Sequence, residues 1–148
     1  MAPKRWLSFL RAGLIAPIAG GVWAGLWFSI FYAAGDAARW PIVFIELAAV
    51  AALYASFVTL VLTWTLGLAW HAFASAMGWR RLSSYVAAGG GVGALAGLAI
   101  ALYSRSDATA FALISIFWLG STGAIVAGTG WLLRRPDHDA ANLDTRAP

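Results

Sequence analysis

The sequence predicts an all-α polytopic membrane protein, a bundle of four transmembrane helices with both termini in the cytoplasm. The first observation is composition: the 148 residues are 61% hydrophobic and only 11% charged, with a mean hydropathy of +0.77. Soluble domains carry about 25% charged residues, because their surfaces face water. The other two observations are long uncharged segments and a one-sided distribution of basic residues. Together they exclude an ordinary soluble domain.

Four segments are long and apolar enough to cross a bilayer. They span about 12–34, 41–70, 84–103 and 108–133. Each supplies at least about 20 apolar-rich residues, which is the length that a helix needs to cross roughly 30 Å of hydrocarbon. No segment alternates strictly between apolar and polar residues, and backbone groups in lipid must be hydrogen-bonded internally, so we expect helices. We expect residues 134–148 to form a flexible cytoplasmic tail.

Residues at the ends of these segments agree with this division. Pro41 suits the first turn of the second helix, and Gly78 suits the end of a cytoplasmic extension of that helix. Ser83 or Ser84 is a candidate N-cap for the third helix, and Asp107 for the fourth. Because the connections are short, we expect helices adjacent in sequence to be antiparallel neighbours.

The basic residues predict the orientation. Eight of the ten lie before the first span, between the second and third, or after the fourth: Lys4, Arg5, Arg11, Arg80, Arg81, Arg134, Arg135 and Arg146. The two other connections hold only Arg39 and Arg105. Basic loops stay in the cytoplasm, so we expect both termini there, in a plasma (inner) membrane. The net charge of +4 therefore reflects topology, and we expect no nucleic-acid partner.

The N-terminus has a second interpretation, because MAPKRW followed by an apolar run resembles a secretory signal peptide. The apolar stretch 14–34 has 21 residues, whereas the apolar core of a signal peptide has about 7–15. We therefore expect a retained transmembrane helix.

The stretch 85–103, YVAAGGGVGALAGLAIALY, contains a possible nucleotide-binding motif. Gly91, Gly93 and Ala96 match the spacing G-x-G-x-x-G/A. That motif needs a buried strand before it and an acidic residue about 20 positions later. Here the glycines lie inside an apolar span, and the next acidic residue, Asp107, lies beyond its far end. We expect no nucleotide cofactor.

The same stretch has the spacing of a helix-packing face. Small residues recur every four positions at Gly89, Gly93, Gly97 and Ala101. Similar rows occur at Gly21 and Gly25 in the first span, and at Gly120, Ala124 and Gly128 in the fourth. Small side chains let helix backbones approach closely in a membrane. Whether the row of the third span packs within the chain or against another copy is left open.

Glu46 is the only acidic residue inside a predicted span. An ionisable group in a membrane is a functional hypothesis by default, and Arg39 and Arg105 are its candidate partners on the same side. It lies about one and a half turns after Pro41, close enough for its carboxylate to reach interfacial water. Two interpretations stay open: a structural or interfacial role, and proton or cation coupling.

The sequence contains no recognisable catalytic or metal-binding set. There are no cysteines, and the two histidines, His71 and His138, are too far apart to clamp a haem. The serines of the spans have no neighbouring base. We therefore expect no enzymatic activity, no metal and no cofactor.

Residues 66–97, LGLAWHAFASAMGWRRLSSYVAAGGGVGALAG, resemble uncharacterised small four-helix bacterial inner-membrane proteins. The resemblance implies topology and no activity. The chain departs from small multidrug transporters, which carry a glutamate in their first helix. We predict an accessory or scaffold subunit that packs in the bilayer as a homo-oligomer or within a larger complex. The alternative is a small oligomeric transporter or channel with Glu46 near its outer vestibule.

Overall fold

Every secondary-structure element that the structure describes is helical. The computed structural model describes residues 3–33, 40–104 and 109–134. The elements are α1 (Pro3–Ala33), α2 (Trp40–Leu62), the π-helical turn η1 (Thr63–Gly67), α3 (Leu68–Ala76), α4 (Leu82–Tyr103) and α5 (Thr109–Arg134). They contain four helical segments long and apolar enough to cross a membrane: Leu7–Ile30, Pro41–Ala76, Leu82–Tyr103 and Thr109–Arg134. The predicted all-α class with four such helices is confirmed.

The first two helical segments are longer than the predicted spans. α1 begins at Pro3, because a helix continues past its apolar part wherever its backbone can still hydrogen-bond. The second segment continues to Ala76 and has 36 residues, about 54 Å at 1.5 Å per residue. That length exceeds roughly 30 Å of hydrocarbon, so α3 is the extension that Gly78 ends. The predicted tail lies outside the described residues apart from Arg134.

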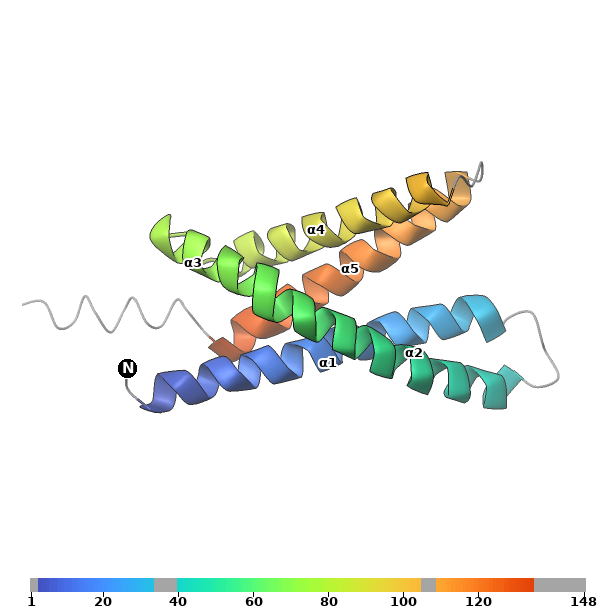
Figure 1. The fold of residues 1–148 in the computed structure, drawn as a ribbon, viewed down its shortest axis with the longest axis horizontal. Coiled ribbons are helices and arrows are strands. Elements are labelled where there is room, and N and C mark those ends of the chain that lie inside the picture. Colours follow the sequence, from blue (N-terminus) through green and yellow to red (C-terminus); the bar gives the residue numbers. More distant parts are fainter. Residues whose placement is uncertain (1–2, 34–39, 105–108, 135–148) are drawn as a thin grey trace, which may run out of the picture.

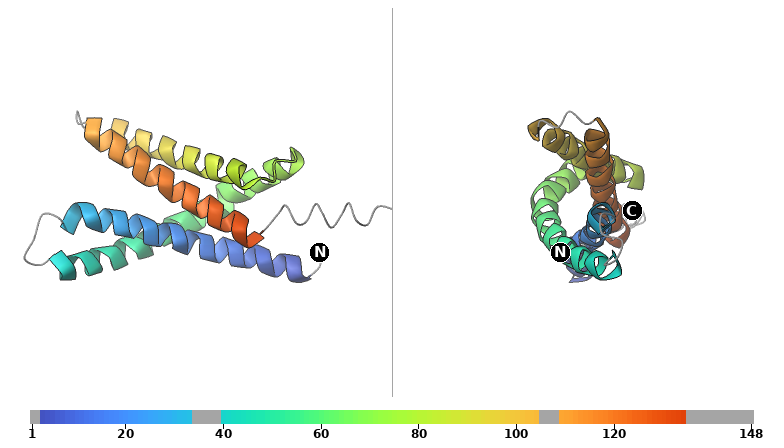
Figure 2. Two further views of the ribbon diagram at one scale, coloured as in Figure 1. Left: turned by 180° about the vertical axis from the view of Figure 1, so that it is seen from behind. Right: turned by 90° about the vertical axis from the view of Figure 1, so that its right-hand side faces the viewer.

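The helices form two hairpins, α1 with α2 and α4 with α5 (Figure 1). α1 also packs on α5, and this contact joins the hairpins. Figure 2 shows that the hairpins lie close together where α5 ends and diverge towards the opposite end. The N-terminus and the turn between α3 and α4 lie at the end where α5 finishes (Figure 1).

One expectation about neighbouring helices is wrong. α2 and α4 follow each other among the long helices, but they make no extensive contact. Backbones approach closely in a membrane where glycine or another small residue faces them. α2 contains no glycine, whereas α1, α4 and α5 do. α4 therefore packs on α5, and α2 packs on α1.

The turn between α3 and α4 is built around Gly78. Its φ of 71° lies in the left-handed region, which glycine enters without steric cost. Trp79 N–H donates to the Ala74 carbonyl at 2.7 Å, and Gly78 N–H donates to the Ser75 carbonyl at 3.3 Å. These two bonds form a Schellman motif, which satisfies the last carbonyls of α3. The predicted end of the helical extension at Gly78 is confirmed.

The predicted serine caps are wrong. α4 begins at Leu82, and its N-cap is Arg81, which makes no side-chain capping bond. Ser83 and Ser84 therefore lie inside the first turn. The Schellman turn sets where the chain leaves α3, and only three residues separate Gly78 from the start of α4. The candidate cap Asp107 lies outside the described residues.

The π-helical turn η1 interrupts the second segment. Thr65 Oγ1 donates to the carbonyls of Val61 and Leu62, at 2.9 and 3.3 Å. Trp64 packs edge-on against Phe9 of α1, with ring centroids 5.6 Å apart. A single π-helical turn of this kind is often found at functional sites.

The buried positions concentrate on α1 and are small. Ala12, Ala16 and Ala24 are buried there, and Pro17 and Ser29 are fully buried. By contrast, no residue from 41 to 73 is buried. Large apolar side chains face outward along all four long segments, the pattern expected of a chain solvated by lipid.

Candidate functional site

The glycine row of α4 faces α5 of the same chain. It consists of Gly89, Gly93 and Gly97, and Ala101 is buried one turn further. A Cβ at the three glycines would meet backbone atoms of Gly123, Leu119 and Ser115 respectively. Backbone atoms cannot swing away as a flexible side chain can. This face is therefore filled within one chain.

The small residues of α5 complete the same interface. Gly120 lies against Ala94 and Gly90, with a Cβ there 3.5 Å from the Ala94 Cβ. A Cβ at Gly90 would lie 3.6 Å from that of Ala124. Gly128 lies against Val86 in the same way, at 3.3 Å. The α5 row predicted at 120, 124 and 128 thus faces α4.

The row of α1 faces α2. A Cβ at Gly25 would lie 2.7 Å from the Ala48 carbonyl oxygen and 2.8 Å from the Ala52 Cβ. Gly21 lies against Ser56 and the carbonyl of Ala52. The two hairpins therefore use the same device, with a glycine on one helix and a small residue or bare backbone on the other.

Aromatic side chains join the hairpins across α1 and α5. Trp23 Nε1 donates a hydrogen bond to Ser121 Oγ at 2.9 Å. Trp27 packs edge-on against Phe117 at 5.6 Å between ring centroids, and Phe28 packs on Trp118 at 6.2 Å. Gly20 gives Val126 room in the same interface.

Glu46 lies on an exposed face of α2. Its neighbours on that helix are large and outward-facing: Ile42 is 65% exposed, Val50 69% and Leu53 76%. The predicted partners Arg39 and Arg105 lie outside the described residues. The structure thus shows that Glu46 is exposed on α2, whereas the pairing of its carboxylate with either arginine stays a prediction.

A cavity of about 470 Å³ lies between the helices, and all six elements line it. We call it the central cavity. Most of its lining is apolar, including Val58, Leu62, Leu119 and Val126. Polar side chains also reach it: Thr59, Thr63, His71, Tyr85, Thr122 and Arg134. An apolar cavity with a few polar groups is the usual form of a small-molecule site.

The polar groups nearest the α3–α4 turn form a cluster. His71 Nδ1 and the Tyr85 hydroxyl share a hydrogen bond of 2.8 Å, and Ser75 also bonds the Tyr85 side chain. The guanidinium groups of Arg80 and Arg134 are near enough to act on Tyr85 electrostatically. On sequence alone, His71 was considered only as a haem ligand, and its pairing with Tyr85 was not predicted.

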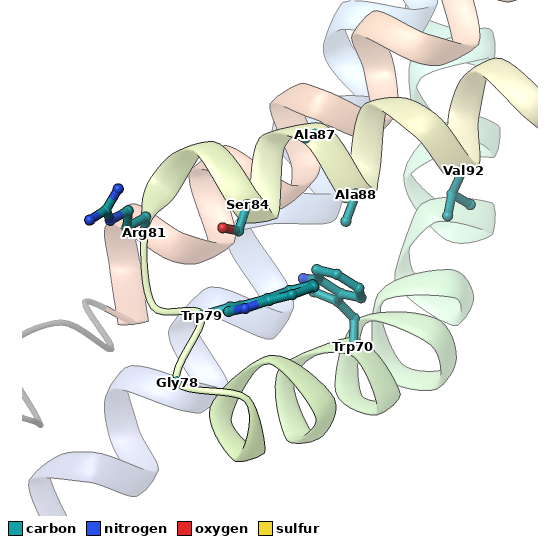
Figure 3. A pocket seen from close by; sticks show the side chains of 8 residues that line it. All are labelled: Trp70, Gly78, Trp79, Arg81, Ser84, Ala87, Ala88 and Val92. Carbon is teal, nitrogen blue, oxygen red and sulfur yellow. The ribbon is translucent and has the colours of Figure 1, made fainter.

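A second, more open hollow of about 720 Å³ lies between α3 and the start of α4. We call it the α3–α4 recess, and Figure 3 shows the eight side chains that line it. The indoles of Trp70 and Trp79 lie beside each other, with centroids 6.2 Å apart. Ser84, Ala88 and Val92 project from one face of α4 towards the side where the indoles lie (Figure 3). No sequence motif indicated this recess, because it combines residues from two helices.

Buried polar atoms without a hydrogen-bond partner line the central cavity, among them Thr63 Oγ1, Trp70 Nε1 and Trp118 Nε1. A buried polar group without a partner costs free energy, so each calls for an acceptor or donor in the cavity. Over the described part of the chain, His, Cys, Asp and Glu form no group of three or more suited to a metal ion.

Comparisons with protein-family models, curated proteins and solved structures find no match to the chain. The structural class of the protein is therefore assigned from the length and composition of its own helices. The chain is a small all-helical protein with four helices long and apolar enough to span a membrane.

Proposed function

We propose that the chain is a multi-pass inner-membrane protein that acts as a non-enzymatic accessory subunit and associates through the exposed face of α2. Both termini lie in the cytoplasm in this proposal. The distribution of basic residues supports the orientation, with eight on one side and two on the other. Arg80, Arg81 and Arg134 lie at the end of the molecule that carries the N-terminus (Figure 1).

The exposed carboxylate of Glu46 carries the proposal. The glycine rows of α1, α4 and α5 face partners within the chain, so they are not available for association. α2 packs extensively only on α1 and the adjoining η1, and none of its residues from Pro41 onward is buried. Exposed Leu or Phe is not costly in lipid, whereas an acidic residue is. Glu46 is therefore the feature of this face that lipid alone does not satisfy.

The occupant that we propose for this face is a second copy of the chain. In the predicted orientation, Arg39 and Arg105 lie on the same side of the membrane as Glu46, so a neighbouring copy would bring a cation to the depth of the carboxylate. An acidic residue at mid-membrane costs about 2.5–3.5 kcal/mol on insertion scales, and less near the interface. Pairing with an arginine offsets part of that cost.

Single-cysteine cross-linking tests the proposal directly, because the chain has no cysteine of its own. Leu53→Cys places a thiol on α2, and Leu95→Cys and Leu113→Cys place matched thiols on the exposed faces of α4 and α5. We expect disulfide-linked dimers in native membranes from the α2 variant only. Equal cross-linking from all three variants, or from none, contradicts the proposal.

Glu46→Gln separates the proposal from its alternative, a small transporter or channel with Glu46 near the outer vestibule. We expect this variant to reduce the oligomer fraction, measured by mass in mild detergent. Flux through liposomes should be absent from both proteins. A pH-dependent flux that is lost with Glu46→Gln supports the transporter instead.

A further inference from the structure

The α3–α4 recess and the central cavity adjoin each other. Trp70, Ala88 and Val92 line both of them. Their volumes, about 720 and 470 Å³, lie within the roughly 300–1,000 Å³ typical of ligand sites. One elongated molecule can therefore extend from the turn at Gly78 into the middle of the bundle.

The two ends of this combined space differ in chemistry. Arg81 and Ser84 line the recess where α4 begins; in Figure 3 the Arg81 side chain extends outward from the rim, and the Ser84 hydroxyl points to the same side. A guanidinium binds phosphate oxygens in two-point geometry, and a serine hydroxyl can donate to the same group. The central cavity ends among apolar side chains such as Val58 and Val126. This arrangement fits an amphiphile with an anionic head and an apolar tail.

The unpartnered polar atoms favour an occupant with uncharged acceptor oxygens. Trp70 Nε1, which has no partner, belongs to the residue shared by both cavities. Trp118 Nε1 lies deeper, in the lining of the central cavity. An indole N–H can only donate, so each requires an acceptor. Ester carbonyl oxygens, which lie between the head and the tail of a glycerolipid, have this chemistry.

The central cavity opens sideways. Leu66 of η1 and Val92 of α4 both line it, and they are 52% and 50% exposed. Both residues lie within apolar segments long enough to span the membrane, so the opening faces the hydrocarbon. A ligand that enters there comes from the bilayer.

We propose that the α3–α4 recess and the central cavity together bind one acidic phospholipid. Its phosphate lies beside Arg81 and Ser84, and one acyl chain passes Trp70 into the central cavity. Basic pockets between transmembrane helices at a cytoplasmic surface are a known way to hold anionic head groups. The site does not depend on the proposed association through α2, because none of its lining residues is Glu46 or one of that residue's outward-facing neighbours Ile42, Val50 and Leu53.

Native mass spectrometry of the full chain tests the head group. Phosphatidylglycerol and phosphatidylcholine with the same acyl chains are titrated into delipidated protein, and glycerol 3-phosphate serves as the chain-free probe. We expect one retained lipid per protomer, a preference for phosphatidylglycerol, and no retention of glycerol 3-phosphate. Arg81→Gln should weaken phosphatidylglycerol retention about fivefold. Arg11→Gln removes the same charge from an exposed position on α1 that lines neither cavity, and it should leave retention unchanged.

Filling the shared wall tests the cavity. Ala88→Leu inserts a larger side chain where the two spaces meet, and it should abolish retention of phosphatidylglycerol. Ala99→Leu is the matched control, because Ala99 is exposed on the same helix and lines neither cavity. Trp70→Phe keeps an aromatic ring but removes the N–H, so it should weaken retention even if Ala88→Leu fails to fold. The spectra report protomer number separately from lipid number, so a failure of association through α2 does not obscure the result.

Two results overturn the inference. If both lipids bind equally and Arg81→Gln behaves as Arg11→Gln does, the bound molecules are unspecific lipids at the protein surface. If glycerol 3-phosphate, which has no acyl chain, binds and displaces the lipid, the site recognises free phosphate and the acyl chain has no part in it.

Discussion

Trp23 Nε1 donates a hydrogen bond of 2.9 Å to Ser121 Oγ, joining residues 98 positions apart in the sequence. Ser121 Oγ donates in turn to the Trp118 carbonyl at 3.0 Å. The first bond crosses from α1 to α5, the contact through which the two hairpins are joined. Polar bonds of this kind between helices stabilise membrane proteins modestly but specifically.

A double-mutant cycle on Trp23→Phe and Ser121→Ala measures that bond. We expect a coupling free energy of about 0.6 kcal/mol, the average for interhelical hydrogen bonds in a membrane protein. Unfolding of the purified protein in detergent, followed by circular dichroism, gives the four free energies. Strict additivity of the two single changes would show that the bond contributes nothing.

Gly93→Ala should destabilise the α4–α5 hairpin. The new methyl group meets the backbone of Leu119, which can move only if the helices separate. We expect a loss of about 1–3 kcal/mol, and Gly93→Leu should prevent stable packing. Gly91→Ala is the control, because a Cβ there meets nothing within 4 Å. That variant should be neutral or slightly stabilising, since alanine favours helix more than glycine does. Equal stability of the two alanine variants would contradict the described interface.

Gly78→Ala should strain the turn between α3 and α4. At a φ of 71° an alanine Cβ crowds the following carbonyl, at a cost of about 1–2 kcal/mol. Gly67→Ala is the control, because Gly67 has a φ of −65° and its Cβ would make only an ordinary contact of 3.6 Å with Thr63. The expected result is a lower thermal midpoint for the first variant only. Matching midpoints would show that the turn adapts freely.

Reporter fusions test the predicted orientation. An alkaline phosphatase domain, which is active only outside the cytoplasm, should be inactive when fused after Arg135 and active when fused after Ser104. The reason is the excess of basic residues on the side of both termini. A cytoplasm-active reporter at the same two positions should give the opposite pattern. Phosphatase activity after Arg135 would reverse the orientation.

The helices were predictable because their signal is local. About 20 apolar residues without a charge are enough to predict a helix able to span a bilayer, and four such helices are present. The positive φ at Gly78 was also predictable, since few other residues end a helix in that conformation. Small residues four apart predicted a packing face at Gly89, Gly93 and Gly97, but their partner could not be predicted. Every glycine-bearing helix offers such a face.

What could not be predicted depends on residues from separate helices. The recess arises because Trp70 of α3 and Ala88 of α4, 18 positions apart in the sequence, line the same space although the two helices do not pack closely there. The pairing of His71 with Tyr85 depends on the angle of the same turn. Short connections suggested that α2 and α4 would be neighbours, and this was wrong because contact in a membrane follows small residues more than loop length. The π-helical turn has no sequence motif of its own.

The π-helical turn also determines the direction in which Trp70 points. Thr59 faces α1, since its hydroxyl donates to the Pro17 carbonyl at 3.0 Å. Trp70 comes eleven residues later, about three complete α-helical turns, and in an unbroken α-helix it would face α1 as well. The turn at Thr63–Gly67 takes up one extra residue, which rotates everything after it by about 100° and brings the indole round to α4. The recess therefore depends on how the backbone is wound as well as on chemistry: the same residues 63–67 wound as a regular α-helix, with every lining side chain kept, would turn Trp70 away from it.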